Sequence, residues 1–247
     1  MRIGVLEAGR VPADMADRHD GFGPMMERLL QGAEPASSVT VYPVLDGVFP
    51  ESPAAQDGWM VTGSRHGVYE DLPWMRTLKA FLCQSVADRV PVVGICFGHQ
   101  ILADAMGGRV EKSDRGWGVG VHRYGVSRPL PFMADAPSSF AIQAMHQDQV
   151  VALPPGAEVI AGSDFCPYGA LAYGDVALSF QGHPEFAAAF SEELIASRKG
   201  ALIPDATAEA ALASLAGRTD APLVGRWIVD FFRAAKAGRV ALQAVPA

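Results

Sequence analysis

The segment Gly94-Ile-Cys-Phe-Gly98, which ends an apolar run over residues 90–95, most constrains the fold of this chain. It predicts a buried strand that stops abruptly, a turn with one cysteine at its apex, and a helix that begins near His99. Glycines on both sides of Cys96 allow a turn too tight for residues with a Cβ, as in a nucleophile elbow that carries cysteine instead of serine. The helix dipole would then favour the reactive thiolate. The alternative, a small core cysteine in a glycine-rich turn, stays open on these residues alone.

Strand and helix patterns alternate through the first half of the chain, which predicts parallel βαβ units. We expect strands at residues 3–6, 39–44, 58–61 and 90–95, and helices at 22–30, at 72–87 and from near His99 to about Gly107. Short segments rich in valine, glycine and aromatic residues then predict a partly antiparallel extension, with strands at 117–126, 140–145, 159–162, 169–173 and 176–181. The alanine-rich last third predicts helices at 187–199, 205–216 and 222–237.

These patterns predict an α/β protein with one domain over residues 1–247. We expect a single open, mostly parallel sheet flanked by helices, with a core at about residues 1–190 and a helical C-terminal segment at about 187–240. A chain of this length can bury a substantial core.

The net charge of −7 argues against nonspecific binding of nucleic acid. The sequence shows neither an apolar stretch long enough to span a bilayer nor a signal-peptide core, so we expect no membrane association. Three cysteines without paired spacing form neither a disulfide framework nor a zinc-finger pattern, and a cytoplasmic location is the default expectation. We expect Cys83 to pack in a helix core and Cys166 to be structural.

The segment Gln181-Gly-His-Pro-Glu185 supplies the partners that a cysteine nucleophile requires, a base and a group that orients it. In an extended backbone, residues i and i+2 project from the same face, so Glu185 can reach the ring of His183. The carboxylate would fix the tautomer of His183 and stabilise its imidazolium form. We therefore predict that Cys96, His183 and Glu185 meet at one edge of the sheet.

Acyl chemistry at a thiolate also needs donors for an oxyanion. The backbone N–H of Phe97 is one candidate, since it follows the nucleophile at the start of a helix. Thr62-Gly63-Ser64, where the preceding strand ends in a glycine turn, is the second candidate. An ordinary βα turn is the alternative for that segment.

With these segments assembled, the chain resembles the class I glutamine amidotransferases. The motifs that carry the resemblance are Gly94-Ile-Cys-Phe-Gly-His-Gln100, Gly182-His-Pro-Glu185 and Val61-Thr-Gly-Ser64, in the family's order. The similarity extends over about residues 1–190, and the chain looks most like stand-alone proteins related to the glutaminase domain of GMP synthase. Further stretches similar to that subgroup lie at residues 63–71, 112–120 and 145–150.

The resemblance implies a flavodoxin-like glutaminase fold and a cysteine hydrolase that cleaves glutamine or a γ-glutamyl compound through a thioester. It implies Cys96 as nucleophile, His183 as base and then acid, and Glu185 as the orienting group. The implied oxyanion donors are the N–H of Phe97 and that of Gly63 or Ser64, with Ser64 favoured by the register of the motif. The implied substrate contacts are Gln100, His146 and Asp148, although a turn closed by Asp148 is a competing account of that last segment. We expect a small-molecule substrate and neither cofactor nor metal, and a synthetase subunit is a candidate partner.

Two other functions stay open. The chain could be a catalytically silent protein that binds glutamine or regulates a synthetase, because fold alone does not guarantee activity. A metal hydrolase that uses Cys96, His99, His146 and His183 is less favoured, since no two of them have ligand spacing on one element. Ser64-Arg65-His66 also stands where many synthetase-linked relatives have Gly-Pro, which leaves the substrate and the geometry of the oxyanion hole open.

Overall fold

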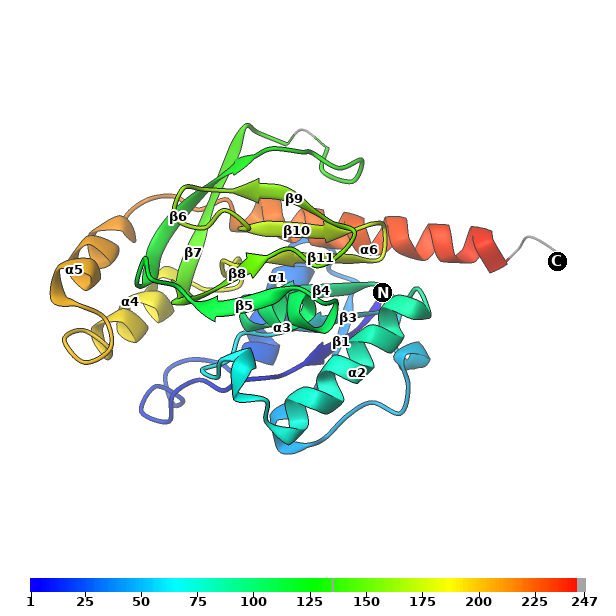
Figure 1. Cartoon of the computed structure of the whole chain (residues 1–247), viewed down its shortest axis with the longest axis horizontal. Coiled ribbons are helices and arrows are strands. Elements are labelled where there is room, and N and C mark those ends of the chain that lie inside the picture. Colours follow the sequence, from blue (N-terminus) through cyan, green and yellow to red (C-terminus); the bar gives the residue numbers. More distant parts are fainter. Residues whose placement is uncertain (135, 244–247) are drawn as a thin grey trace.

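The computed structural model describes residues 1–134 and 136–243, with the side chains of the last helix described as far as residue 238. It contains a nine-stranded sheet (Figure 1), whose strands in spatial order are β2 (Ser38–Tyr42), β1 (Arg2–Leu6), β3 (Gly58–Val61), β4 (Val92–Ile95), β11 (Ala177–Phe180), β10 (Ala170–Tyr173), β9 (Ala157–Gly162), β6 (Gly118–Val126) and β7 (Ser139–His146). A smaller sheet pairs β5 (Arg109–Lys112) with β8 (Asp148–Ala152).

The helices alternate with the first strands and then close the chain. They are α1 (Phe22–Ala33), α2 (Pro73–Ala87), α3 (Phe97–Ala105), α4 (Ala188–Ala196), α5 (Asp205–Ser214) and α6 (Ala221–Gln243). Short 3-10 turns lie at η1 (Val44–Asp46), η2 (Pro53–Ala55) and η3 (Val68–Glu70). No helix within the described residues is both long and apolar enough to cross a membrane.

The strand pairing confirms the predicted α/β architecture. Strands β2, β1, β3, β4 and β11 pair in parallel, in the order of a flavodoxin-like sheet. From β11 to β7 the pairing is antiparallel, which is the predicted extension. The carboxyl ends of β3, β4 and β11 therefore lie at one edge of the sheet, where α/β proteins of this type bind ligands.

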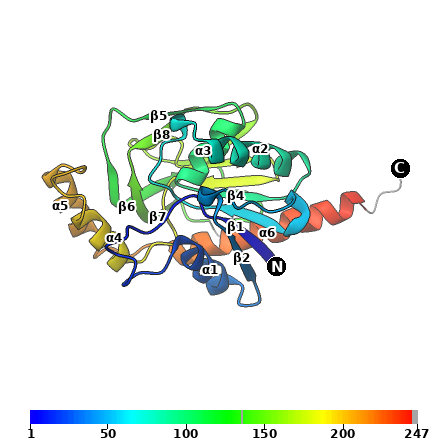
Figure 2. The ribbon, with the colours of Figure 1, turned by 90° about the horizontal axis from the view of Figure 1, so that it is seen from below.

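Helices cover both faces of the sheet, as the view from below shows (Figure 2). Ile3 and Val5 point to the face covered by α1 and α6, where they share a cluster with Trp227. Leu6 and Trp59 point to the face covered by α2 and α3. This alternation follows from the two-residue period of a strand, and each large side chain buried in this way stabilises the fold by about 1.5–3 kcal/mol.

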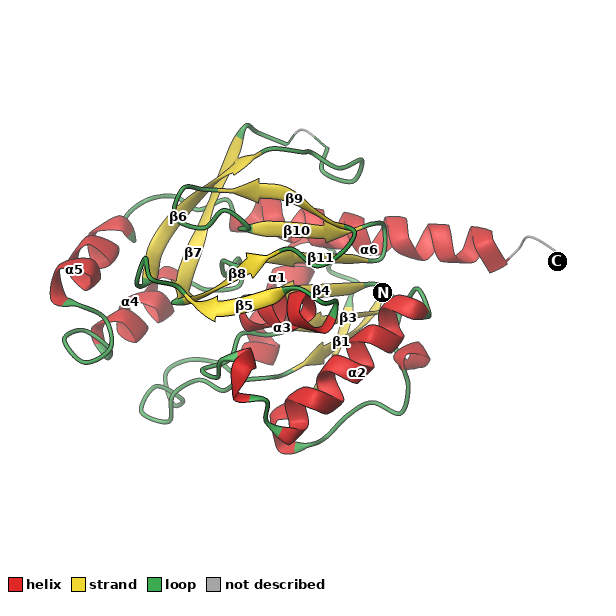
Figure 3. Cartoon of the chain, viewed as in Figure 1, coloured by secondary structure: helices red, strands yellow, loops and turns green. Residues whose placement is uncertain are grey.

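Helices α4 and α5 form a separate lobe beside β6 and β7 (Figure 3). Val119 of β6 packs there with Ile195 of α4, Ile203 of the following loop and Ala208 and Ala211 of α5. The lobe therefore packs on the antiparallel half of the sheet, and the burial of Ile203 anchors the loop after α4 against β6.

Two details differ from the sequence-based expectations. The pair β5–β8 was not predicted, because Arg109–Lys112 contains one buried residue, Val110, and carries no alternating pattern of its own. The expectation that Cys83 packs in a helix core is wrong: Cys83 is exposed, and its thiol donates to the carbonyl of Ala105 at 3.4 Å. The buried stripe of α2 instead consists of Met75, Leu78, Leu82 and Ser85, at helical spacing that excludes position 83.

Candidate active site

Cys96 lies at the junction of β4 and α3 in a strained backbone conformation, with φ of 53° and ψ of −102°. Its N–H donates to the carbonyl of Phe180 on β11 at 2.8 Å, and its carbonyl accepts the N–H of Gln100 at 3.0 Å. Such a conformation for a residue with a Cβ costs about 1–3 kcal/mol and persists only where the surroundings enforce it. The cysteine is therefore placed by the sheet and the helix together.

The glycines of the motif are needed for close packing. A Cβ on Gly94 would lie 2.4 Å from the carbonyl oxygen of Gly98, and a Cβ on Gly98 would lie 2.3 Å from that of Val61 on β3. Both distances are far shorter than van der Waals contact. The tight elbow expected from the flanking glycines is confirmed, although the left-handed φ belongs to Cys96 itself.

His183 lies three residues beyond β11 and is held from three directions. Its N–H donates to the carbonyl of Gln143 on β7 at 2.7 Å. Its Nδ1 donates to Oε1 of Glu185 at 2.7 Å, with the two side chains only 3% and 1% exposed. The ring of Phe186 stacks on the imidazole, with centroids 3.8 Å apart and planes at 9°. The imidazole therefore has one orientation and a fixed tautomer on its Nδ1 side.

The contact between His183 and Glu185 arises from a turn. Pro184 and Glu185 lie in a turn after the isolated bridge of His183. The predicted contact between Glu185 and the ring of His183 is found, but a turn brings the two side chains together, and not the alternation of an extended strand.

The surroundings of His183 raise its pKa from 6.5 to about 10. Burial opposes the charged ring, but the negative charge of Glu185 and the charge and hydrogen bond of Cys96 outweigh it. His99 and His146 lack a carboxylate partner, and burial lowers the pKa of each to about 3. Glu185 and Cys96 are thus what separate His183 from these two buried histidines, and both favour the charged ring.

The end of β3 touches both Cys96 and His183. A Cβ on Gly63 would lie 2.9 Å from Cε1 of His183 and 3.8 Å from Cβ of Cys96. The Thr62 hydroxyl accepts the N–H of Ala8 and donates to the carbonyl of Gly63, both at 3.0 Å. This bracing fixes the turn beside the sulfur.

Two further predicted residues lie near the elbow. Phe97 is the first residue of α3, so its N–H has no acceptor within the helix. Ser64 follows Gly63, and its hydroxyl accepts the N–H of His66 at 3.2 Å. Both positions leave backbone donors near Cys96.

A cavity of about 450 Å³ opens on the sulfur. Of the residues predicted from the sequence, its wall contains Ser64, Cys96, Gln100, His146 and Asp148. The remaining four, Gly63, Phe97, His183 and Glu185, lie outside that wall. The cavity therefore reaches Cys96, while His183 and Glu185 are buried outside it.

The predicted substrate contacts are also bonded to the protein. The amide of Gln100 donates to the carbonyl of Asp148 at 2.8 Å and to Oε1 of Gln181 at 3.2 Å. Nδ1 of His146 donates to the same carbonyl at 3.2 Å. Burial raises the pKa of the Asp148 carboxyl, which accepts the hydroxyl of Tyr69 at 3.4 Å. The turn between β7 and β8 is thus closed by the backbone oxygen of Asp148, while its carboxylate faces the cavity.

Sequence reasoning missed several residues of the site. Phe186, stacked on His183, directly follows the His-Pro-Glu segment, so its position in the sequence is the signal that could have found it. Trp117, Arg198 and Leu202 also line the cavity. Trp117 belongs to the stretch 112–120 that carries part of the resemblance, whereas no local pattern marks Arg198 and Leu202, because the packing of the α4–α5 lobe brings them there.

The histidines near the site do not gather around a common point. His99 is fully buried, and its Nδ1 lies 2.8 Å from the hydroxyl of Ser179. Throughout residues 1–134 and 136–243, no three His, Cys, Asp or Glu side chains are placed to hold a metal ion.

The chain belongs to the class I glutamine amidotransferases, because residues 50–198 match the family "Glutamine amidotransferase class-I". It is 36% identical over 160 residues to gamma-glutamyl peptidase 5 of Arabidopsis thaliana, and this alignment covers 59% of this chain and 61% of that protein. It is 31% identical over 176 residues to one subunit of the glutamine-hydrolysing GMP synthase of Halobacterium salinarum, covering 70% of this chain and 88% of that subunit.

Solved structures share this fold. The structure of a glutamine amidotransferase from Thermotoga maritima aligns with a TM-score of 0.73 and 21% identity, and covers 94% of this chain and 98% of that one. The chain spans about three fifths of the length of the gamma-glutamyl peptidases that it matches.

Proposed function

We propose that this protein is a Cys-His-Glu hydrolase that cleaves the γ-glutamyl amide bond of glutamine or of a γ-glutamyl peptide. The observation that carries the proposal is the strained Cys96, which acts on His183 across the turn at Gly63, together with Glu185, which holds Nδ1 of His183 at 2.7 Å. The relatives named gamma-glutamyl peptidase support this choice of bond.

In the first half of the reaction, His183 accepts the proton of the Cys96 thiol, the thiolate sulfur attacks the side-chain carbonyl carbon, and a tetrahedral oxyanion forms. The N–H groups of Phe97 and of Ser64 or Gly63 stabilise that oxyanion. His183 then donates a proton to the leaving nitrogen, the C–N bond breaks, and a γ-glutamyl thioester remains.

In the second half, His183 accepts a proton from water, and the water oxygen attacks the thioester. The C–S bond breaks, and glutamate and the regenerated Cys96 result, so that one water is consumed for each amide bond cleaved. Glu185 stabilises the imidazolium throughout. Gln100, His146 and Asp148 contact the glutamyl group in this scheme.

The test is covalent labelling with a diazo-ketone analogue of glutamine, followed by mass-spectrometric mapping of the adduct. We expect one adduct, on Cys96, that excess glutamine prevents. Cys83→Ala is the matched control, because Cys83 is exposed and would react with any unspecific alkylator. Labelling that spares Cys96 and requires Cys83 or Cys166 would contradict the proposal, as would turnover that survives Cys96→Ala.

The similarity to part of a GMP synthase favours one variant of this function, a glutaminase that becomes active with a synthetase partner. Ammonia release from glutamine, measured with the purified protein alone and then with synthetase subunits, separates the two. Turnover without a partner supports the free-standing hydrolase. Labelling of Cys96 without turnover in either arm would indicate a silent glutamine-binding protein.

A further inference from the structure

Arg198, in the loop after α4, lines the same cavity as Cys96. Its side chain is half-buried, and Nη1 donates to the carbonyl of Leu194 at 3.2 Å. Among the described residues, no carboxylate lies within 4 Å of it, and Asp14 acts on it only at longer range. Burial lowers the pKa of this guanidinium. A partly desolvated arginine without an ion-pair partner is suited to binding an anion.

Burial sets Arg198 apart from the other cations of the cavity. Arg65 and Lys112 also line it, but both are exposed, and Glu70 in the same wall is bonded to Nδ1 of His66 at 2.8 Å. Arg198 is therefore the half-buried guanidinium of this wall.

The backbone holds Arg198 in place. Its carbonyl accepts the N–H groups of Ala201, Leu202 and Ile203 at 3.2, 3.0 and 3.0 Å. Ile203 is fully buried in the α4–α5 lobe. The side chain therefore starts from a rigid turn, so that less conformational entropy is lost when it binds a ligand.

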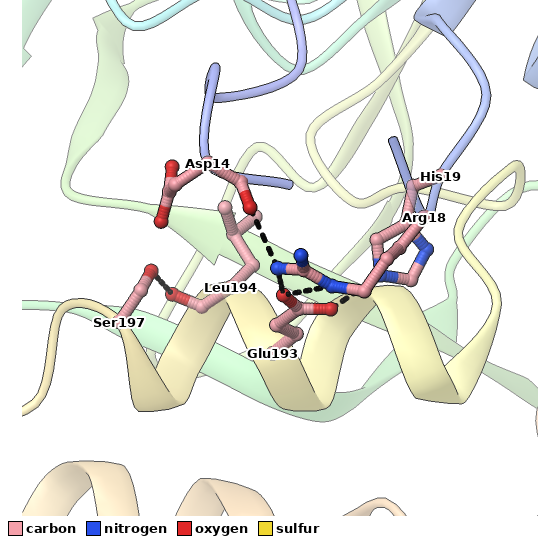
Figure 4. A network of polar contacts seen from close by, with 6 residues as sticks. All are labelled: Asp14, Arg18, His19, Glu193, Leu194 and Ser197. Carbon is pink, nitrogen blue, oxygen red and sulfur yellow. Dashed lines mark hydrogen bonds and ion pairs between the residues drawn. The ribbon is translucent and has the colours of Figure 1, made fainter. Parts of the chain in front are cut away.

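A polar network fixes α4 itself to the loop that follows β1 (Figure 4). Nε of Arg18 donates to Oε1 of Glu193 at 3.0 Å, and Nε2 of His19 lies 2.7 Å from Oε2 of the same residue. Arg18 also donates to the carbonyl of Asp14 at 2.6 Å. The helix that leads to Arg198 is thus tied to the loop after β1.

Exposed apolar side chains line the same cavity as Arg198. Leu202 is 61% exposed and Tyr69 is 56% exposed, which makes them the two most exposed of the large apolar side chains described. Both line the cavity, together with Trp117. Exposed apolar side chains gathered at a cavity mouth are typical of a surface that a ligand covers.

We propose that Arg198 binds the carboxylate of the leaving group, and that Leu202, Tyr69 and Trp117 contact its side chain. The preferred substrate is then a γ-glutamyl dipeptide whose second residue is large and apolar and has a free carboxylate. This inference rests on the proposed hydrolase function. Glutamine, whose leaving group is ammonia, leaves this part of the cavity empty.

The test compares three substrates, γ-glutamyl-leucine, γ-glutamyl-leucine amide and glutamine, in the wild type and in Arg198→Gln. We expect the variant to lower kcat/KM for γ-glutamyl-leucine by about tenfold to a hundredfold, the range of one charged hydrogen bond, mainly through KM. The amide and glutamine should change less than about twofold, since neither offers the carboxylate. Arg198→Lys should retain part of the preference.

Arg226→Gln is the matched control, because Arg226 is exposed and also donates only to a carbonyl four residues earlier, that of Pro222. It should leave all three substrates unchanged. An equal loss on all three substrates in Arg198→Gln, or no loss on γ-glutamyl-leucine, would overturn the inference while leaving the hydrolase intact.

A second readout does not need turnover. γ-Glutamyl-leucine should protect Cys96 from the diazo-ketone analogue, and Arg198→Gln should weaken this protection by about tenfold or more in concentration while glutamine protects both proteins equally. Absent labelling of Cys96 in the wild type would overturn the proposed function, and this inference with it. Labelling with unchanged protection in Arg198→Gln would overturn this inference alone.

Discussion

Replacement of Glu185 by glutamine tests the electrostatic design of the site most directly. The change keeps the shape of a side chain that is 1% exposed and removes the charge that lies 2.7 Å from Nδ1 of His183. The difference between the ordinary pKa of 6.5 and the value of about 10 corresponds to roughly 5 kcal/mol in favour of the imidazolium. Without the carboxylate, burial opposes the charged ring and only the charge and hydrogen bond of Cys96 still favour it.

His99 and His146 show the effect of burial on a histidine without a carboxylate partner, since burial lowers the pKa of each to about 3. In Glu185→Gln we therefore expect the pKa of His183 to fall well below 10. A weaker hold on the proton of the proposed donor and loss of the enforced tautomer should lower turnover by about 10³–10⁴-fold.

The assay is a titration of the histidine ring nitrogens by ¹⁵N NMR from pH 5 to 11, with the His183 signals identified by their absence in His183→Gln. Glu193→Gln is the matched control, because it removes a carboxylate at the same 2.7 Å from another histidine, His19. It should leave the titration of His183 unchanged. A ring of His183 that still titrates near pH 10 in Glu185→Gln would refute the reasoning.

The same shift fixes the sign of a stability effect. The folded-state pKa of His183 lies above its unfolded value, so its contribution is complete below pH 6.5 and is lost as the pH rises through about 10. The thermal stability of the wild type should therefore fall more steeply over this interval than that of Glu185→Gln, as differential scanning calorimetry would show.

Two other predictions concern the framework of the site. Gly98→Ala should destabilise the protein by about 1–3 kcal/mol in urea denaturation, because its Cβ would meet the carbonyl oxygen of Val61 at 2.3 Å. Gly32→Ala is the control, because Gly32 lies in α1 and its Cβ would have nothing within 4 Å. That change should be neutral or stabilise the protein by up to about 1 kcal/mol. An equal effect of the two would contradict the packing argument. Hydrogen bonds from Arg18 and His19 lower the pKa of Glu193 to about 2, so in a ¹³C carboxyl titration Arg18→Gln should raise it toward 4.5. An unchanged titration would mean that Arg18 does not hold α4.

The parts of the fold that the sequence predicted well are those with strong local patterns. Residues 58–61 form β3 and the helix opened by Pro73 runs to Ala87, as expected, because an apolar run and a proline at the first helical position act locally. The strand β5 has no such pattern and exists because β8 pairs with it. Tertiary context decides such strands, and a single sequence does not carry it.

The site divides in the same way. Cys96, His183 and Glu185 belong to short motifs at strand ends, and the parallel topology brings strand ends to one edge, so their proximity was predictable. Their roles stay a proposal that labelling tests. Arg198 has no such motif: it lies in a helical C-terminal segment whose composition says nothing about the cavity it reaches. Its place depends on how the α4–α5 lobe packs on β6.

The backbone of Cys96 has a consequence for how this protein tolerates change. At φ of 53° and ψ of −102°, glycine would relax the chain at this position and remove the sulfur. Folding and chemistry therefore favour different residues at one point of the molecule. If the thiol of Cys96 had no function, replacing it by glycine would raise the stability of the fold. The stability of the fold therefore does not explain why this position carries a cysteine.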